Sequence, residues 1–260
     1  MKTLVIIPSR LSASRLPGKP LLKINGLSMI SHVFKRAEKA NIGEVIVAAE
    51  DQEIVDDVKK NGGNAILTSN KHKTGTDRIY EAFQKLNMSK IDLIMNLQGD
   101  EPLMNVEDIR ILNKQMSDTD SQLGTLASVI QDKELFNNLN IVKLISSEML
   151  NDINFPEVVN FLRKILDKNR NIYHHLGIYC YTSYTLKKFV SLRQTSNEIE
   201  NKLEQLRALD NGIKINVALA KSSPIGVDTE EDLVAIKKIM EYKVEWTKFI
   251  FKGHLARIHI

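Results

Sequence analysis

The sequence has little of several features that would set it apart from ordinary globular proteins. Its 260 residues include one cysteine, Cys180, so an internal disulfide is excluded and a reducing compartment is favoured. No apolar stretch approaches the ~20 residues of a membrane span, and we expect no signal peptide, because the apolar run after Met1 is short. The net charge of +4 is small, and no nucleic-acid-binding motif is present. We therefore expect a cytoplasmic protein without a membrane span and without a nucleic-acid partner.

What the sequence does have is an alternation of strand and helix signals. Apolar residues make up 43% and charged residues 26% of the chain, which is enough for a substantial core. The alternation predicts an α/β protein with a mixed, mostly parallel sheet flanked by helices. We expect one domain over 1–242 with a smaller subdomain within about 100–215, and a tail, 243–260, of unknown role. The expected strands are 4–7, 44–50, 64–68, 91–97, 122–130, 140–145, 174–182 and 213–220, and the expected helices are 28–40, 51–63, 76–86, 156–166, 197–209 and 229–242.

A basic loop follows the first expected strand, which Pro8 ends. Arg10, Arg15 and Lys19 lie in this loop with little acid nearby. Cations beyond the carboxyl end of a strand suit an anion such as a polyphosphate, although a solvated basic loop fits three scattered cations equally well. The loop matches neither the G-x-G-x-x-G dinucleotide fingerprint nor the Walker A pattern, because its one glycine is Gly18.

Two acidic residues are candidates for a metal site. Asp100, in "NLQGDEP", follows a buried strand and so lies at the edge where open α/β sheets bind ligands. Its carboxylate suits Mg²⁺, or it simply caps the next helix. Asp228, in "GVDTEEDL", precedes the last expected helix, where a capping role is the simpler interpretation. Asp228 gains a function only if the chain folds back to place it beside Asp100.

Three other segments carry polar groups with two interpretations each. "KHKTGTDR" offers Thr74, Thr76 and backbone amides to an anion or a base, and the same residues cap a helix well. His175 begins an apolar strand, where a histidine is usually a hydrogen-bonded core residue unless it faces a cleft. Glu204 and Gln205 lie on an amphipathic helix, where they form either a solvated rim or part of a site.

Six segments in order make the chain resemble the 3-deoxy-manno-octulosonate (Kdo) cytidylyltransferase family, also called CMP-Kdo synthetases. The resemblance covers roughly residues 3–242. It implies a nucleotidyltransferase domain of the glycosyltransferase-A type over 1–242, usually a homodimer. The implied reaction joins CTP and Kdo to give CMP-Kdo and pyrophosphate, which activates the sugar for lipopolysaccharide. The segments are "IIPSRLSASRLPGKPL", "TGTDR", "NLQGDEP", "HHLGIYCYT", "KLEQLRALDNG" and "VDTEEDL".

The resemblance also implies Mg²⁺ as cofactor and a set of site residues. Asp100 and Asp228 are the expected Mg²⁺ ligands, and Lys19 is expected to act with them in catalysis. CTP and Kdo are the implied partners. The implied nucleotide-binding residues are Arg10, Ser14, Arg15, Lys19, Thr74, Gly75, Thr76, Arg78 and Gln98, and the implied sugar-binding residues are His175, Tyr179, Glu204 and Gln205.

One segment departs from the family's pattern. After "VKVV" the family usually has "SRxxIP", whose arginine faces the sugar, whereas this chain has "VKLISSEMLNDINFPEVVNFLRK". Arg163 is a candidate for that role. The departure leaves open CMP transfer to 8-amino-Kdo or another acidic ulosonate. A non-catalytic CTP or sugar-acid binding protein is a further alternative, which the presence of both acids disfavours.

Overall fold

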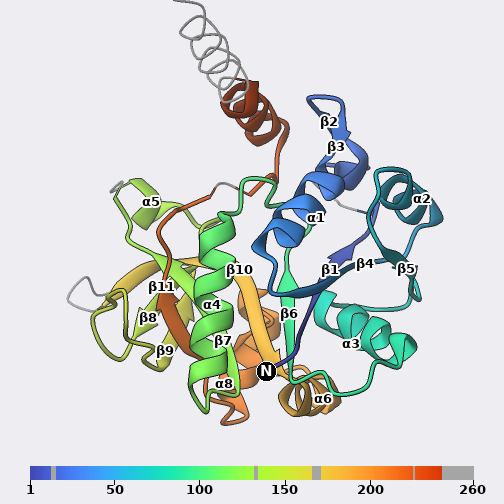
Figure 1. Ribbon diagram of the computed structural model, residues 1–260. Coiled ribbons are helices and arrows are strands. Elements are labelled where there is room, and N and C mark those ends of the chain that lie inside the picture. Colours follow the sequence, from blue (N-terminus) through green and yellow to red (C-terminus); the bar gives the residue numbers. More distant parts are fainter. Residues whose placement is uncertain (13–15, 132–133, 166–170, 225, 242–260) are drawn as a thin grey trace, which may run out of the picture.

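The computed structural model describes residues 1–12, 16–131, 134–165, 171–224 and 226–241 (Figure 1). Its main sheet has the strand order β11 (Asn216–Leu219), β7 (Leu123–Ser128), β10 (Ile172–Thr182), β6 (Leu93–Leu97), β1 (Thr3–Ser9), β4 (Gly43–Ala49) and β5 (Ala65–Leu67). A branch continues from β10 to β8 (Lys143–Ser146) and β9 (Val158–Leu162). The β6-β1-β4-β5 half is parallel, and so is the β11-β7 pair, whereas β10 runs antiparallel to β6, β7 and β8. The mixed, mostly parallel sheet is confirmed.

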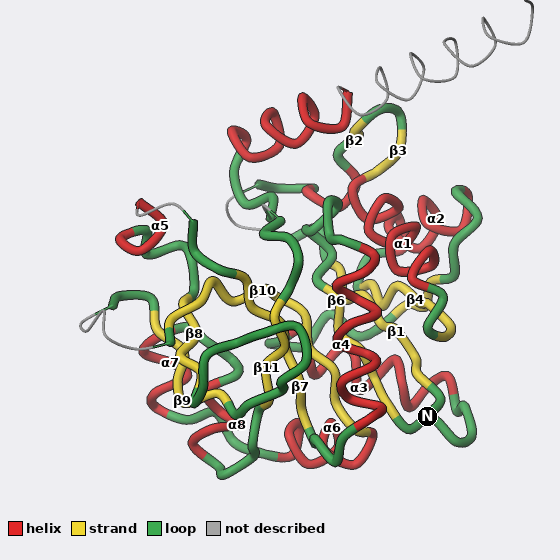
Figure 2. Tube along the Cα trace, turned by 60° about the vertical axis from the view of Figure 1, so that its left-hand side comes forward, coloured by secondary structure: helices red, strands yellow, loops and turns green. Residues whose placement is uncertain are grey.

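Helices cover both faces of this sheet (Figures 1 and 2). Successive side chains of a strand point to opposite faces, so Val5 and Ile7 of β1 join one buried cluster while Leu4 and Ile6 join the other. The first face packs against α1 (Met29–Ala40), α2 (Gln52–Lys60) and α4 (Val106–Asp118). The second face packs against α3 (Gly75–Leu86), α6 (Ser183–Ser191) and α8 (Leu206–Asp210). None of the helices within the described ranges is long and apolar enough to cross a membrane.

A third cluster ties the end of the described chain to its beginning. A helix over 230–241 packs Leu233 and Ile236 against Ile24 of the small hairpin formed by β2 (Lys23–Ile24) and β3 (Leu27–Ser28). Figure 1 shows this helix beside the β2-β3 hairpin, at the top of the picture. This packing brings Asp228 close to the loop after β1, which it must approach if it is to share a site with Asp100.

Local signals explain where the site-bearing helices start. The Ser28 hydroxyl accepts a hydrogen bond from the Ser31 N–H and so caps α1. Thr74 caps α3 in the same way through the Asp77 N–H. Gly18 has φ 68°, a left-handed conformation that favours glycine, and it turns the chain into a short 3₁₀ helix over Lys19–Leu21.

Two predicted helices are wrong. Within the predicted helix 156–166, Val158–Leu162 form the strand β9, because the adjacent valines Val158 and Val159 favour an extended chain that pairs with β8. The predicted helix 197–209 is two short helices, α7 (Ser196–Asn201) and α8, separated at Lys202, which has φ 53°. The strand expected at 140–145 begins only at Lys143. Helices α4 and α6, the short α5 (Glu134–Asn137) and the β2-β3 hairpin were not predicted.

Candidate active site

A cavity of about 310 Å³ lies at the carboxyl ends of β1 and β6. This is the edge at which open α/β sheets bind ligands. Its walls come from the loop after β1, the segment before α3, the turn after β6 and Asp228. We call it the first cavity. It is lined by Pro8, Ser9, Arg10, Leu16, Lys19, Pro20, His72, Lys73, Thr74, Gly75, Arg78, Gln98, Gly99, Asp100 and Asp228.

The structure brings Lys19, Asp100 and Asp228 together in this cavity. The Lys19 ammonium lies 2.7 Å from Asp100 Oδ2 and 3.4 Å from Asp228 Oδ1, and it also donates to the Val227 carbonyl at 2.7 Å. The side chains of Asp100 and Asp228 are 32% and 43% exposed, whereas Lys19 is 13% exposed. One buried cation therefore holds two carboxylates at the cavity wall.

The cap of the helix 230–241 is built by Thr229 and Asp232. The Thr229 hydroxyl accepts from the Asp232 N–H at 3.2 Å, and the Asp232 carboxylate accepts from the Thr229 N–H at 2.9 Å. These two residues supply the reciprocal contacts of a helix cap. Asp228 lines the first cavity together with Asp100. The chain therefore folds back to place the two residues at one site, as a functional role of Asp228 requires.

The carboxylates of Asp100 and Asp228 are the described groups that fit a metal ion at this cavity. The described residues contain no cluster of three or more His, Cys, Asp or Glu side chains that would hold a metal on their own. Mg²⁺ often takes only one or two protein carboxylates and completes its octahedron with water and substrate phosphate oxygens. The pair therefore fits Mg²⁺ that arrives with a nucleotide.

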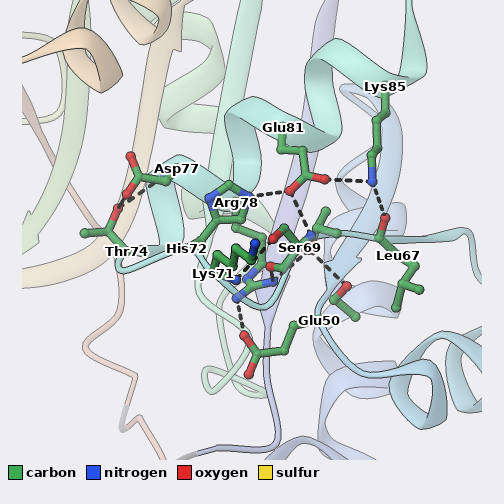
Figure 3. Close-up of polar contacts among 12 residues, drawn as sticks. Glu50, Leu67, Ser69, Lys71, His72, Thr74, Asp77, Arg78, Glu81 and Lys85 are labelled. Atoms are coloured by element: carbon green, nitrogen blue, oxygen red, sulfur yellow. Dashed lines mark hydrogen bonds and ion pairs between the residues drawn. The ribbon is translucent and has the colours of Figure 1, made fainter.

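The segment before α3 is held by Glu81 (Figure 3). The Glu81 carboxylate accepts from the Ser69 N–H at 2.8 Å, pairs with Lys85 at 2.7 Å and contacts His72 Nε2. Burial alone raises the pKa of Glu81, but the donors Lys85, His72 and Ser69 outweigh it and lower the pKa to about 2. Glu81 thus stays ionised and anchors the segment that presents His72 to the first cavity.

Arg78 fastens the same segment from the inside of α3. Its guanidinium donates to the Thr68 hydroxyl at 2.7 Å and the Ser69 carbonyl at 3.0 Å, and it pairs with Glu50 (Figure 3). The side chain is buried, yet it lines the first cavity. Arg78 was predicted to bind the nucleotide. The structure places it in the wall of the first cavity, which its contacts with Thr68, Ser69 and Glu50 support.

A second cavity of about 250 Å³ meets the first at Gln98, which lines both. The predicted sugar-binding residues His175, Tyr179, Glu204 and Gln205 all line it. None of the described residues that line it is a lysine or an arginine. The full set is Thr76, Asn96, Gln98, Val142, His175, Gly177, Tyr179, Tyr181, Leu203, Glu204 and Gln205, so Thr76 lies here rather than in the first cavity.

The His175 ring is held in one tautomer. The Thr125 hydroxyl donates to the Ile178 carbonyl at 2.7 Å and lies 3.0 Å from His175 Nε2. A hydroxyl has one proton, so Nε2 must be the donor to Thr125 and Nδ1 must carry a lone pair. Burial lowers the pKa of His175 to about 3, which keeps the ring neutral. The ring packs 5.0 Å from that of Phe161 and 5.3 Å from that of Tyr179, and its Nδ1 is a hydrogen-bond acceptor.

Glu204 is the ionisable acid of the second cavity. Its side chain is 30% exposed, whereas its Oε1 atom is buried and has no hydrogen-bond partner among the described residues. Burial raises the pKa of Glu204 to about 7, and the nearby hydroxyls of Thr76 and Thr74 limit the rise. A carboxyl that titrates near neutrality therefore faces the second cavity.

Glu101 is a buried acid that lines neither cavity but lies beside Gly177 of the second one, and no sequence pattern singles it out. β10 has a bulge between Leu176 and Tyr179, where a Cβ on Gly177 would lie 3.0 Å from Glu101 Oε1 and 3.1 Å from Gln98 Cγ. Only glycine allows this close approach. Burial and then the neighbouring Asp100 charge raise the pKa of Glu101 to about 8, despite a hydrogen bond from the Gly177 N–H.

Three of the predicted site residues are not among the described lining of either cavity. Ser14 and Arg15 lie outside the described residues. Arg163 lines neither cavity, because its guanidinium donates to the carbonyls of Leu139, Asn201 and Lys202 at 3.0 to 3.3 Å. Several lining residues were not predicted. His72 and Lys73 lie within the segment that was singled out before α3, whereas Asn96, Val142, Tyr181 and Leu203 resemble ordinary core positions.

Comparisons with known proteins agree on one family. The family model described as "Cytidylyltransferase" matches residues 4–215. The chain is similar to the 3-deoxy-manno-octulosonate cytidylyltransferase of Afipia carboxidovorans, at 42% identity over 92% of this chain and 96% of that protein. It is equally similar to the protein of that name from Thermodesulfovibrio yellowstonii, at 41% identity over 92% of this chain and 98% of that protein.

Solved structures give the same result. A CMP:2-keto-3-deoxy-manno-octonic acid synthetase complexed with CTP superposes with a TM-score of 0.84 at 34% identity, covering 94% of this chain and all of that one. A 4-diphosphocytidyl-2C-methyl-D-erythritol synthase from Anaerococcus prevotii superposes with a TM-score of 0.61 at 12% identity, covering 92% of this chain and 98% of that one. The second likeness shows the fold alone.

Proposed function

The chain belongs to the 3-deoxy-manno-octulosonate cytidylyltransferase family, and we propose from this and from its paired cavities that it transfers CMP from CTP to Kdo. The observation that carries the proposal is the meeting of the two cavities at Gln98, two residues before Asp100. A nucleotide in the first cavity and a sugar acid in the second would have their reacting ends beside the Lys19, Asp100 and Asp228 group. Roles for individual residues are part of the proposal.

The reaction is an in-line displacement at phosphorus. The anomeric hydroxyl oxygen of the sugar forms a bond to the α-phosphorus of CTP, and the bond from that phosphorus to the bridging oxygen breaks, so that pyrophosphate leaves. The hydroxyl proton is released to solvent. The residues position the reactants and neutralise phosphate charge, which accounts for most of the catalysis in phosphoryl-type transfers. Arg10, Lys19, Lys73 and Arg78 are the described lysines and arginines that line the first cavity, and we assign this role to them.

Asp100 and Asp228 would hold the magnesium of the enzyme. When bound there, Mg²⁺ supplies Lewis-acid stabilisation of phosphate oxygens and lowers the pKa of a coordinated hydroxyl. Lys19 keeps the two carboxylates close together before substrate arrives. A cytoplasmic homodimer stays part of the proposal, as the sequence predicted.

A pyrophosphate-release assay with Mg²⁺, CTP and Kdo tests the proposed function. We expect release that depends on both substrates, and CTP should outperform ATP and GTP by a wide margin. Equal turnover with the three nucleotides would contradict the assignment. CTP binding without any turnover would instead support the non-catalytic binding protein.

The choice of sugar has its own test. The segment 146–165, which departs from the family's pattern, runs through β9, and Phe161 of β9 packs against the His175 ring of the second cavity. This observation keeps 8-amino-Kdo and other acidic ulosonates as candidate substrates. Comparing kcat/KM for Kdo and 8-amino-Kdo at saturating CTP decides between them.

A further inference from the structure

A buried ion pair lies directly behind the second cavity. Arg207 of α8 donates through Nε to Glu198 Oε2 at 2.8 Å and through a terminal nitrogen to Glu198 Oε1 at 2.5 Å. The two side chains are 3% and 4% exposed. Because both charges are removed from water, each depends strongly on the other. Neither residue lines the first or the second cavity.

Both members of the pair are fixed in place. Glu198 belongs to a capping box with Thr195, and its carboxylate also accepts from Gln194 Nε2 at 3.1 Å. The Arg207 guanidinium lies over the Phe189 ring, 4.8 Å from its centroid, so its plane is set by α6 as well as by Glu198. The guanidinium therefore has little freedom to move toward a ligand.

The terminal nitrogen of Arg207 that bonds to Glu198 Oε1 also faces Glu204. A terminal nitrogen of Arg207 lies 4.0 Å from Glu204 Oε1, the buried oxygen that has no hydrogen-bond partner among the described residues. Glu204 and Arg207 lie three residues apart, but the backbone N–H of Arg207 bonds to the Glu204 carbonyl, so this geometry belongs to the turn that opens α8. One arginine thus serves two carboxylates: it is bonded to Glu198 and adjacent to Glu204.

Arg207 is the cation among the described groups that face Glu204. From α3 and its cap, Thr74, Thr76 and Asp77 face Glu204, and Asp77 raises its pKa. From β10, Tyr179 and Tyr181 face it, and burial raises the pKa of both phenols, so they stay neutral. Arg207 lowers the pKa of Glu204 against the effects of burial and Asp77.

The ionisation of Glu204 decides what it can bind. A carboxylate accepts hydrogen bonds through both oxygens, whereas a protonated carboxyl donates one. A sugar acid carries several hydroxyl donors, and the Glu204 side chain, which is 30% exposed, lines the cavity that would receive them. The ionised form therefore matches such a ligand, and a pKa of about 7 places the change of form at neutral pH.

We propose that Arg207 is a positioning residue, which keeps the Glu204 carboxylate ionised and oriented toward the hydroxyl groups of the acidic sugar, so that sugar binding strengthens as Glu204 loses its proton. This inference rests on the proposed function, because it assigns the sugar to the second cavity. It adds a residue outside both cavities and a dependence of sugar affinity on pH.

The sign of two substitutions separates this role from a merely structural one. Arg207→Met removes the cation, so the pKa of Glu204 should rise by about one unit or more, the size of shift that an opposite charge within ~4–6 Å produces. Glu198→Gln leaves Arg207 without its charged partner, so the pKa of Glu204 should fall. Both variants break the same ion pair and should destabilise the fold in the same direction.

The direct measurement is a carbon-13 NMR titration of the glutamate carboxyl groups in the free, full-length protein, with the Glu204 signal assigned from Glu204→Gln. We expect the Glu204 titration to move up in Arg207→Met and down in Glu198→Gln. The double variant Glu198→Gln/Arg207→Met has no uncompensated buried charge, and its titration should follow Arg207→Met. This variant also serves if either single variant fails to fold.

The functional measurement is KM for the sugar at saturating CTP across roughly pH 6 to 9. In the unchanged protein KM should fall as pH rises through about 7, the pKa of Glu204. The pH at which the sugar KM falls should be higher in Arg207→Met and lower in Glu198→Gln. In Glu204→Gln the sugar KM should no longer depend on pH in this range. Asp57→Asn is the matched control, because it breaks a half-buried contact with Lys23 outside both cavities. It should leave the pH dependence of the sugar KM unchanged.

Shifts of the Glu204 titration in the same direction, or no shift in the two single variants, would overturn the inference. The inference would also be overturned if the Glu204 titration shifts up in Arg207→Met and down in Glu198→Gln as expected, but the sugar KM does not depend on pH. Absence of pyrophosphate release from CTP and Kdo in the unchanged protein would be a failure of the proposed function instead. The NMR titration needs no turnover and would then still decide whether Arg207 controls Glu204.

Discussion

Arg10, Lys19 and Lys73 line the first cavity together with Asp100 and Asp228, whereas the described lining of the second cavity has neither lysine nor arginine. The first is built on loops at the carboxyl ends of parallel strands. The second is built mainly on the antiparallel strand β10 and on the turn between the short helices α7 and α8. Under the proposed function both receive anionic substrates, so the first cavity uses cations, and the second uses hydrogen bonds, including those that the Glu204 carboxylate accepts.

This difference implies different kinetic signatures. Charges at the first cavity act on phosphate groups whose charge redistributes during transfer, so their loss should appear mainly in kcat. Under the proposed function, the hydrogen-bond acceptors of the second cavity contact parts of the sugar that do not react, so their loss should appear mainly in the sugar KM. Substitutions at each cavity test whether kcat and the sugar KM separate in this way, from the largest expected effect to the smallest.

The largest effect should come from the two carboxylates of the first cavity. Asp100→Asn and Asp228→Asn should each lower kcat by orders of magnitude, because each removes a negative charge from the proposed Mg²⁺ site. The melting temperature should change little, since asparagine is nearly the same size. Steady-state kinetics with a thermal unfolding scan measures both quantities.

The double variant sharpens this prediction. If Asp100 and Asp228 act as a unit, the double substitution should cost far less than the product of the two single effects. A nearly silent Asp228→Asn would exclude that residue from the proposed Mg²⁺ site, since the cap of the following helix is built by Thr229 and Asp232. Magnesium titrations of the single variants should show a raised requirement for the ion.

Lys19→Ala should have the next largest effect. Its ammonium contacts both carboxylates and lines the first cavity, so it serves phosphate oxygens as a point charge. We expect kcat/KM for CTP to fall by roughly 10²-fold or more, the scale of losing one transition-state donor. Lys19→Arg, which keeps the charge, is the control. A near-normal rate for Lys19→Ala would return the lysine to the solvated-loop interpretation.

The same contrast explains which parts of the structure the sequence predicted. The first cavity follows from local rules: a buried strand ends, a loop with cations or an acid follows, and parallel strands deliver these loops to one edge. The placement of Asp228 beside Asp100 did not follow from these local rules. It depends on the packing of Leu233 and Ile236 against the β2-β3 hairpin.

The second cavity was harder to predict because its residues come from long-range pairing. Val158 to Leu162 carry an apolar spacing that fits a helix or a strand, and pairing with β8 decides for a strand. Asn96 and Tyr181 resemble core positions until the bulge of β10 opens the cavity beside them. Glu204 was identified through the family resemblance, and its raised pKa comes from burial, which a sequence pattern does not reveal.

At the second cavity, His175→Phe should raise the sugar KM and leave the CTP KM unchanged. Phenylalanine keeps the ring that packs between Phe161 and Tyr179, but it removes the Nδ1 acceptor. We expect a rise of about tenfold, the effect of one lost hydrogen bond of ~1.4 kcal/mol. Thr125→Val, which frees the tautomer and keeps the ring, should give a smaller rise. Equal changes in both KM values would contradict the separation of the two cavities.

The smallest effect should come from Arg163, the arginine that the sequence offered as a sugar ligand. Its guanidinium donates to the carbonyls of Leu139, Asn201 and Lys202, and it lines neither cavity. Arg163→Met should therefore lower the free energy of unfolding by only about 0.5–1.5 kcal/mol, because the three carbonyls belong to exposed residues and can bond to water instead. The sugar KM should stay nearly unchanged. Urea unfolding and steady-state kinetics measure the two effects on one preparation. If the sugar KM instead rises tenfold while stability is kept, Arg163 leaves its carbonyls for the sugar carboxylate, and the second cavity then binds its anion by charge as the first one does.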